Sequence, residues 1–230
     1  MANSRTAKAV NDPFRVVESQ EARIALAHLH RQAHRNRWWQ LLRSLSLTAL
    51  THEPKAENHA RMAPYLRRTT GALLHQLALM ADARLIVSIG SCGGLAAVWL
   101  ACALRGGRGR QGDRGLICIE EDAACGALTR SAVRAAGVSR YVEVTDVYAP
   151  NVAARIDDTI DFVFVDGHFE TAARCLQLLY PHLRHGAVVF AHDVASREEG
   201  GRVQDYLRDS DRFASLPLEF PLHCELGVNL

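Results

Sequence analysis

The chain of 230 residues is long enough for one domain with a sizeable core, or for one domain and an appendage, and we favour the second arrangement. Its net charge is only +2 and its 27 basic residues are scattered, so the composition does not indicate a nucleic acid or an anionic membrane as partner. Six cysteines without a C-x-x-C spacing, a polar amino terminus and the lack of a long apolar segment predict a soluble protein of the reducing cytoplasm.

The first third of the chain, residues 13–81, has helical patterns throughout. We predict a first helix over residues 14–34. An aromatic and apolar stretch, residues 37–42, follows this helix, and the Thr-His-Glu-Pro sequence of residues 51–54 indicates a break in the chain.

A second helix is predicted just before the composition changes. Apolar residues recur at helical spacing from Met62 to Met80, which indicates an amphipathic helix that leads into the first strand. After Arg84, short β-branched runs alternate with helical patterns, so we divide the chain into a helical segment, residues 1–81, and a second unit, residues 82–230. The helical segment either caps the active site or forms a homodimer interface, and the pattern does not separate these roles.

The first strand leads into a turn that is rich in glycine. The apolar run of residues 85–89 is followed by the glycine-containing residues 90–94 and then by a helical pattern. Glycine permits a positive φ and the close approach of a ligand, toward which the first amides of the helix point. The next predicted strand, residues 115–120, ends at Glu120, whose carboxylate can accept hydrogen bonds from a ribose diol. Together these features predict an adenosine-type ligand.

The remaining patterns form a regular series of strands and helices. We predict a helix over 123–136, a strand over 141–145, a short segment around Ala153, a strand over 160–166, a helix over 172–183, a strand over 186–191, a helix around 204–207, and strand-like runs over 213–220 and 223–228. Only two residues separate the last two runs, so they must pair as an antiparallel hairpin. The predicted fold is therefore α/β, with a doubly wound, mostly parallel sheet of seven strands.

Three blocks of this series, residues 85–94, 161–168 and 183–194, resemble the matching blocks of small O-methyltransferases related to catechol O-methyltransferase. These enzymes are class I S-adenosylmethionine-dependent methyltransferases with a Rossmann-like fold. The resemblance covers roughly residues 60–230 and rests on three blocks in the same order. It implies S-adenosyl-L-methionine as cofactor and a small molecule as methyl acceptor.

The resemblance also implies which residues bind this cofactor. The glycine turn would hold its methionine part, Glu120 its ribose, and Asp166 would face the reacting groups. Ser88 and Tyr148 stand where the family usually carries acids; Tyr148 either stacks beside adenine or is a surface aromatic residue. The full predicted set of cofactor-binding residues is Ser88, Gly90, Ser91, Gly93, Glu120, Tyr148 and Asp166.

A metal site is implied at the ends of the fourth and fifth strands. Metal-dependent members bind a divalent cation through an Asp after strand four, matched by Asp166, and an Asp-Asn pair after strand five, where this chain has His192 and Asp193. The implied ligands are therefore Asp166, His192 and Asp193, and the ion is Mg²⁺, Mn²⁺ or, because of the imidazole, a softer transition ion. Alternatively, His192 and Asp193 form only a helix-capping turn.

The predicted reaction is O-methylation of a small-molecule hydroxyl, with Asp166, His168 and His192 as the catalytic candidates. His168 lies two residues beyond Asp166, where an imidazole can act as general base or as an extra ligand. A nicotinamide dehydrogenase is disfavoured, because Cys92 occupies a position at which the dinucleotide fingerprint requires glycine. Two alternatives remain: a metal-independent N- or C-methyltransferase with a histidine base, and a non-catalytic binding module.

Overall fold

The structure is a computed structural model, and it describes most of the chain. The described ranges are residues 12–50, 66–91, 93–107, 115–120, 122–146, 149–166, 171–194, 198–209, 211–218 and 224–230. Within them, the side chains of residues 36–50, 149 and 198–199 are not described. Structural statements below concern the described residues and side chains.

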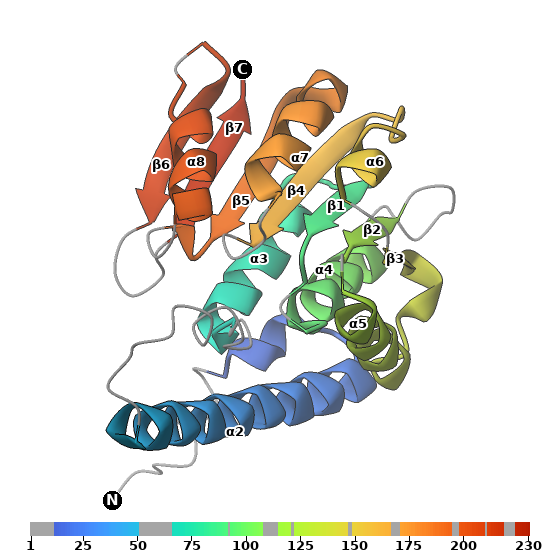
Figure 1. Cartoon of the computed structure of the whole chain (residues 1–230). Coiled ribbons are helices and arrows are strands. Elements are labelled where there is room, and N and C mark those ends of the chain that lie inside the picture. The colour runs from blue at the N-terminus through green and yellow to red at the C-terminus, as the bar shows by residue number, and fades with distance from the viewer. Residues whose placement is uncertain are drawn as a thin grey trace, which may run out of the picture.

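The centre of the molecule is a seven-stranded sheet with the order β3-β2-β1-β4-β5-β7-β6 (Figure 1). The strands are β1 Ile86–Ile89, β2 Leu116–Ile119, β3 Val142–Thr145, β4 Ile160–Asp166, β5 Leu183–His192, β6 Phe213–Leu218 and β7 Cys224–Asn229. Strands β1 to β5 pair in parallel, whereas β7 is antiparallel to both β5 and β6. This topology confirms the predicted fold class, including the antiparallel pair at the carboxyl end.

Helices cover both faces of the sheet (Figure 1). The helices are η1 Pro13–Val16, α2 Gln20–Leu50, α3 Arg68–Met80, α4 Leu95–Gly106, α5 Ala123–Ala135, η4 Ser139–Tyr141, α6 Ala149–Ala153, α7 Ala172–Leu179, η5 Tyr180–His182 and α8 Glu198–Leu207. On β4, Phe162 and Phe164 belong to a hydrophobic cluster with α2, α3, α4 and α5, whereas Val163 and Val165 belong to a cluster with α6, α7 and α8. The alternation follows from the period of two in a strand and explains why β4 is buried along its whole length.

The predicted amino-terminal helix was wrong in its extent. Instead of a helix over 14–34 followed by a separate aromatic stretch, the structure has the short η1 and then one continuous helix, α2, which includes residues 37–42. Residues 20–50 contain neither glycine nor proline, so aromatic residues alone do not interrupt the helix. None of the described helices combines the length and apolar character that crossing a membrane requires. The break predicted at 51–54 lies outside the described residues.

The amino-terminal elements pack directly against α4. Phe14 of η1 stacks on Trp99 of α4 with ring centroids 5.7 Å apart, and the Trp99 indole donates a hydrogen bond to Nε2 of His30 at 3.3 Å. A Cβ on Gly71 of α3 would lie 2.2 Å from Nε1 of Trp99, so only glycine permits this crossing of α3 and α4. These contacts place η1, α2 and α3 in the same core as the sheet. The predicted boundary near residue 82 and the role as a cap or dimer interface stay predictions.

Candidate active site

The glycine turn follows β1 at the carboxyl edge of the sheet. Gly90, Gly93 and Gly94 all have positive φ angles, of 72°, 64° and 88°. Among the described residues, a Cβ on Gly93 would meet no atom within 4 Å, whereas a Cβ on Gly94 would lie 2.6 Å from the Cβ of Ala132 in α5. Gly93 therefore borders open space, and Gly94 permits α5 to approach the turn closely.

The carboxylate of Glu120 lies against this turn. Glu120 follows β2, is only 5% exposed, and donates its backbone N–H to the carbonyl of Thr145 at 2.8 Å. Its Oε1 atom accepts a hydrogen bond from the Ser91 hydroxyl and another, at 3.1 Å, from the Thr129 hydroxyl. Of the predicted binding residues, Ser91 and Glu120 are thus in direct contact, although they are 29 positions apart in the sequence.

Burial controls the protonation of Glu120. Removal from water raises the pKa of its carboxyl group above the usual value, and the hydrogen bonds from Ser91 and Thr129 oppose this change without reversing it. The nearby charges of Asp166 and Asp122 raise the pKa further. A buried carboxylate that repels its acidic neighbours is stabilised by any ligand that donates hydrogen bonds to it.

Asp166 and His192 lie side by side at the same edge. Asp166 is the last residue of β4 and His192 the last of β5, and their Cα atoms are register partners. Both side chains are buried, and the His192 ring stacks on Phe164 with centroids 6.2 Å apart. Asp193 follows with a φ of 54°, a left-handed conformation that costs a non-glycine residue about 1 kcal/mol. The strands thus bring two of the predicted catalytic residues together.

The other predicted residues contribute differently or lie outside the described part of the chain. Ser88 is buried in β1, and its hydroxyl donates a hydrogen bond to the carbonyl oxygen of Gly90 at 2.5 Å. This hydrogen bond stabilises the start of the turn. His168, Tyr148 and Cys92 are outside the described residues. The roles of all these residues stay predictions.

The predicted metal site finds only limited support. Across the described side chains, no group of three or more His, Cys, Asp or Glu residues is arranged to hold a metal ion. Asp166 and His192 are paired through their strands, but the described residues do not complete a ligand set with Asp193. The described donors alone therefore do not make up a complete ligand set, and the metal site stays a prediction.

Two polar residues at this edge were missed by the sequence reasoning. Thr129 of α5 contacts both Ser91 and Glu120. Asp146 follows β3 and forms an ion pair with Arg130 at 3.2 Å, and the hydrogen bond from Arg130 lowers the pKa of Asp146. The rule that selected Glu120, an acid directly after a strand, would also have selected Asp146. Thr129 had no such signal, because it lies within a helical pattern.

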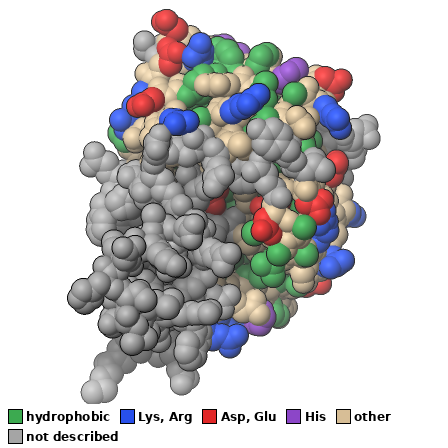
Figure 2. Space-filling view, in the orientation of Figure 1, with side chains coloured by type: hydrophobic (Ala, Val, Ile, Leu, Met, Phe, Trp, Pro, Cys, Tyr) green, Lys and Arg blue, Asp and Glu red, His purple; other side chains and the backbone are tan. Residues whose placement is uncertain are grey.

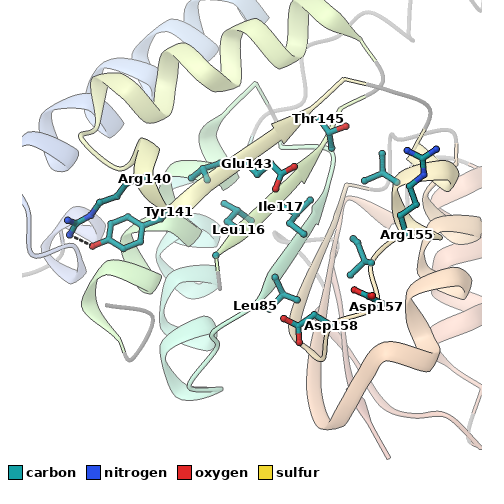
Figure 3. A pocket seen from close by; sticks show the side chains of 14 residues that line it. Leu85, Leu116, Ile117, Arg140, Tyr141, Glu143, Thr145, Arg155, Asp157 and Asp158 are labelled. Atoms are coloured by element: carbon teal, nitrogen blue, oxygen red, sulfur yellow. Dashed lines mark hydrogen bonds between the residues drawn. The ribbon is translucent and has the colours of Figure 1, made fainter. Parts of the chain in front are cut away.

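A groove of about 710 Å³ lies elsewhere, on the face of the sheet (Figure 3). It is lined by residues of β2 and β3 and by Arg155, Asp157 and Asp158 after α6. The groove extends from Leu85, before β1, to Thr145, at the end of β3. We place the candidate site at the carboxyl edge instead, because the glycine turn and the buried polar residues meet there.

The visible surface carries charges of both signs (Figure 2). On the described part of this face, acidic and basic side chains are interspersed and form no extended patch of one sign. This distribution is consistent with the nearly balanced charge of the sequence. It gives no electrostatic support for a polyanionic partner on that part of the face.

Solved structures with the same fold include several methyltransferases. An O-methyltransferase from Bacillus cereus in complex with SAH has a TM-score of 0.62 at 19% identity, and the match covers 83% of this chain and 90% of that one. The O-methyltransferase TomG from Streptomyces achromogenes, involved in tomaymycin synthesis and in complex with SAM, has a TM-score of 0.60 at 24% identity, with coverage of 85% and 97%. A methyltransferase from Geobacter sulfurreducens has a TM-score of 0.60 at 23% identity, with coverage of 81% and 94%.

The sequence itself matches a protein-family model. Residues 87–194 match the family described as a methyltransferase domain, and this range runs from β1 to the residues just after β5. No curated protein matches the sequence. The match to a methyltransferase-domain family and the fold shared with solved methyltransferases both support the recognition of a class I S-adenosylmethionine-dependent methyltransferase that was made from the sequence.

Proposed function

We propose that the protein methylates a hydroxyl oxygen of a small molecule, with S-adenosylmethionine as methyl donor. The observation that carries this proposal is the contact of Ser91 in the glycine turn with the buried carboxylate of Glu120. Asp166 and His192 end the neighbouring strands at the same edge. Ligands of open α/β sheets bind beyond these strand ends. The O-methyltransferases among the similar structures support oxygen as the acceptor atom.

The residues at the turn fit the parts of this cofactor. Gly93, with open space where its Cβ would lie, gives a ligand room to approach the backbone. Both hydrogen bonds that the described residues give to the Glu120 carboxylate are accepted by Oε1, which leaves Oε2 for the ribose hydroxyls. When bound, the cofactor supplies an electrophilic methyl group on a sulfonium.

The acceptor requires orientation and a group that takes up its proton. Among the described residues at this edge, the His192 imidazole is of the type suited to accept that proton, and it ends the strand next to that of Asp166. A divalent cation, if one takes part, would be held by Asp166, His192 and Asp193, and it would lower the pKa of the acceptor hydroxyl. Because the described donors do not form a complete ligand set, no step here depends on that cation.

A second candidate function is methyl transfer to nitrogen or carbon without a metal. The burial of Asp166 and His192 at adjacent strand ends favours this candidate, because a histidine near a carboxylate can act as a base without a metal. A binding module without catalysis is a third candidate. Cofactor binding with no transfer to any acceptor would support that third possibility.

Calorimetry and a transfer assay test the proposal together. We expect S-adenosylhomocysteine to bind the wild-type protein and radiolabelled S-adenosylmethionine to label small phenolic or catecholic acceptors. The assay is repeated with excess EDTA and with added Mg²⁺ or Mn²⁺, and the linkage in the product is identified as an ether or an amine. Failure to bind S-adenosylhomocysteine would overturn the proposal, and an N- or C-methylated product would replace it with the second candidate.

A further inference from the structure

Thr129 of α5 has no part in the proposed function so far, yet it touches both polar residues at the glycine turn. Its side chain is fully buried. Its Oγ1 atom lies 2.7 Å from Oγ of Ser91 and 3.1 Å from Oε1 of Glu120. Three oxygen atoms, from the residue after β2, from the turn and from α5, thus form one hydrogen-bonded cluster.

A count of protons shows how this cluster is arranged. Ser91 has a single hydroxyl proton, which it donates to Glu120, while its Oγ accepts the backbone N–H of Gly94 at 3.2 Å. The Ser91–Thr129 hydrogen bond must therefore use the proton of Thr129. That single proton is shared between two acceptors, Oγ of Ser91 at 2.7 Å and Oε1 of Glu120 at 3.1 Å, so Thr129 donates to both residues and more closely to Ser91. With Thr129 donating to Ser91, every donor and acceptor site of the Ser91 hydroxyl is used.

The position of Thr129 depends on the close approach of two helices. A Cβ on Gly94 would lie 3.1 Å from the Cα of Thr129, so a larger residue at position 94 would push α5 away from the turn. The start of α5 is fixed by Asp122, whose side chain accepts the amides of Ala124 at 2.7 Å and Cys125 at 3.0 Å. Two turns later, the buried side of α5 presents the Thr129 hydroxyl to Ser91.

We propose that Thr129 is a positioning residue for the donor nucleoside: its hydroxyl holds Ser91 and, through Ser91, orients Glu120 so that Oε2 meets the ribose hydroxyls. This inference rests on the proposed function, because it requires a ribose-containing ligand. The other described charged groups that act on the carboxylate are Asp122 and Asp166, and both are anions, which cannot replace a hydroxyl donor. The ability to distinguish ribose from deoxyribose therefore depends on a hydroxyl at position 129.

The test compares two nucleosides on matched variants. Thr129→Val keeps the shape of the side chain but removes the hydroxyl, Thr129→Ser keeps the hydroxyl, and Ser91→Ala breaks the chain of hydrogen bonds in its middle, between Thr129 and Glu120. Calorimetry gives the Kd of each full-length protein for S-adenosylhomocysteine and for its 2′-deoxy analogue, and thermal melting without ligand shows whether each variant is folded. The ratio of the two Kd values is the readout, because a purely structural role of Thr129 would lower the melting temperature without changing this ratio.

We expect the wild type and Thr129→Ser to prefer the ribose form about tenfold, the effect of one hydrogen bond to a charged group. Thr129→Val and Ser91→Ala should lose most of this preference. An unchanged preference in Thr129→Val, or a preference lost equally in Thr129→Ser, would overturn the inference and leave the proposed function intact. A wild type that binds neither nucleoside would instead overturn the proposed function, and the inference with it.

Discussion

Two carboxylates are buried at opposite edges of the same sheet, and the groups that donate hydrogen bonds to them differ. At the amino end, Asp161 accepts the backbone amides of Arg84 and Leu85 at 2.8 and 2.9 Å and the guanidinium of Arg184 at 2.8 Å. At the carboxyl end, Glu120 receives only hydroxyl groups, and both reach the same oxygen atom. The described residues give Glu120 no arginine or lysine partner.

The difference separates a structural acid from a functional one. Asp161 ties the start of β1 to β4 and to Arg184, whose guanidinium also donates to the carbonyl of Ala81 at 2.7 Å. A cation and two amides satisfy this carboxylate without any ligand. Glu120 is held in place but is left with an oxygen that no described group uses, and a buried carboxylate in that state favours a ligand that donates hydrogen bonds. The predictions below test this contrast from both sides.

The largest effect should come from removing the structural acid. Asp161→Ala leaves two amides and the Arg184 guanidinium without their acceptor, so we expect a loss of roughly 2–4 kcal/mol in the free energy of unfolding. Urea denaturation measures this loss, and Asp157→Ala, an exposed acid near the groove, is the matched control. The affinity for S-adenosylhomocysteine should stay unchanged at temperatures where the variant is folded. A variant of normal stability with weakened binding would reverse the assignment of the two acids.

Glu120→Gln should have the opposite profile. The amide keeps the shape of the side chain but replaces a charged acceptor with a neutral one, so the Kd for S-adenosylhomocysteine should rise about 30- to 100-fold. Stability should not fall, because burying the charge of Glu120 is itself unfavourable. Calorimetry and thermal melting on the same preparation give both quantities. Unchanged affinity in this variant would remove Glu120 from the site.

The sequence predicts the parts of this contrast that depend on neighbouring residues in the chain. It does not predict the parts that depend on contacts between residues far apart in the chain. The strand over 160–166 was predicted residue for residue, because a continuous apolar run between polar residues marks a buried strand. The place of Glu120 follows from the same strand pattern. The contact of Glu120 with Thr129 does not follow from the strand pattern. That contact requires α5 to lie close to the glycine turn, and this close approach is possible because Gly94 has no Cβ. The long α2 was missed because the predicted helix was ended at residue 34 and the aromatic stretch of residues 37–42 was set apart from it, although no glycine or proline separates them.

The pH dependence of binding should distinguish the two acids again. Burial raises the pKa of Glu120 above the ordinary 4.5, so the carboxyl group becomes protonated earlier as the pH falls. We expect the affinity of the wild type for S-adenosylhomocysteine to decline on acidification before an ordinary glutamate would titrate, and the affinity of Glu120→Gln to lack this decline. Calorimetry between about pH 8 and pH 5 measures both proteins.

The stability of the ligand-free protein should change in the opposite direction. A carboxyl group whose folded-state pKa is raised contributes stability at low pH, and this contribution is lost as the pH rises through the folded-state pKa. Above that pKa, Glu120→Gln should therefore be at least as stable as the wild type. A wild-type affinity that is constant down to about pH 5 would show that the carboxylate charge is not needed for binding.

The smallest effect is expected from a single methyl group beside the turn. Gly93→Ala places a Cβ on a backbone with a φ of 64°, which should cost about 1 kcal/mol of stability, but the methyl group meets no atom of the described residues within 4 Å. If the cofactor uses this open space, its Kd should rise roughly tenfold in addition. Gly201→Ala in α8 is the matched control, because its Cβ also meets nothing within 4 Å and its φ is not positive. Equal affinities in the two variants would mean that the space beside Gly93 is not part of the cofactor site, and Glu120 would then have to bind its ligand from another side of the turn.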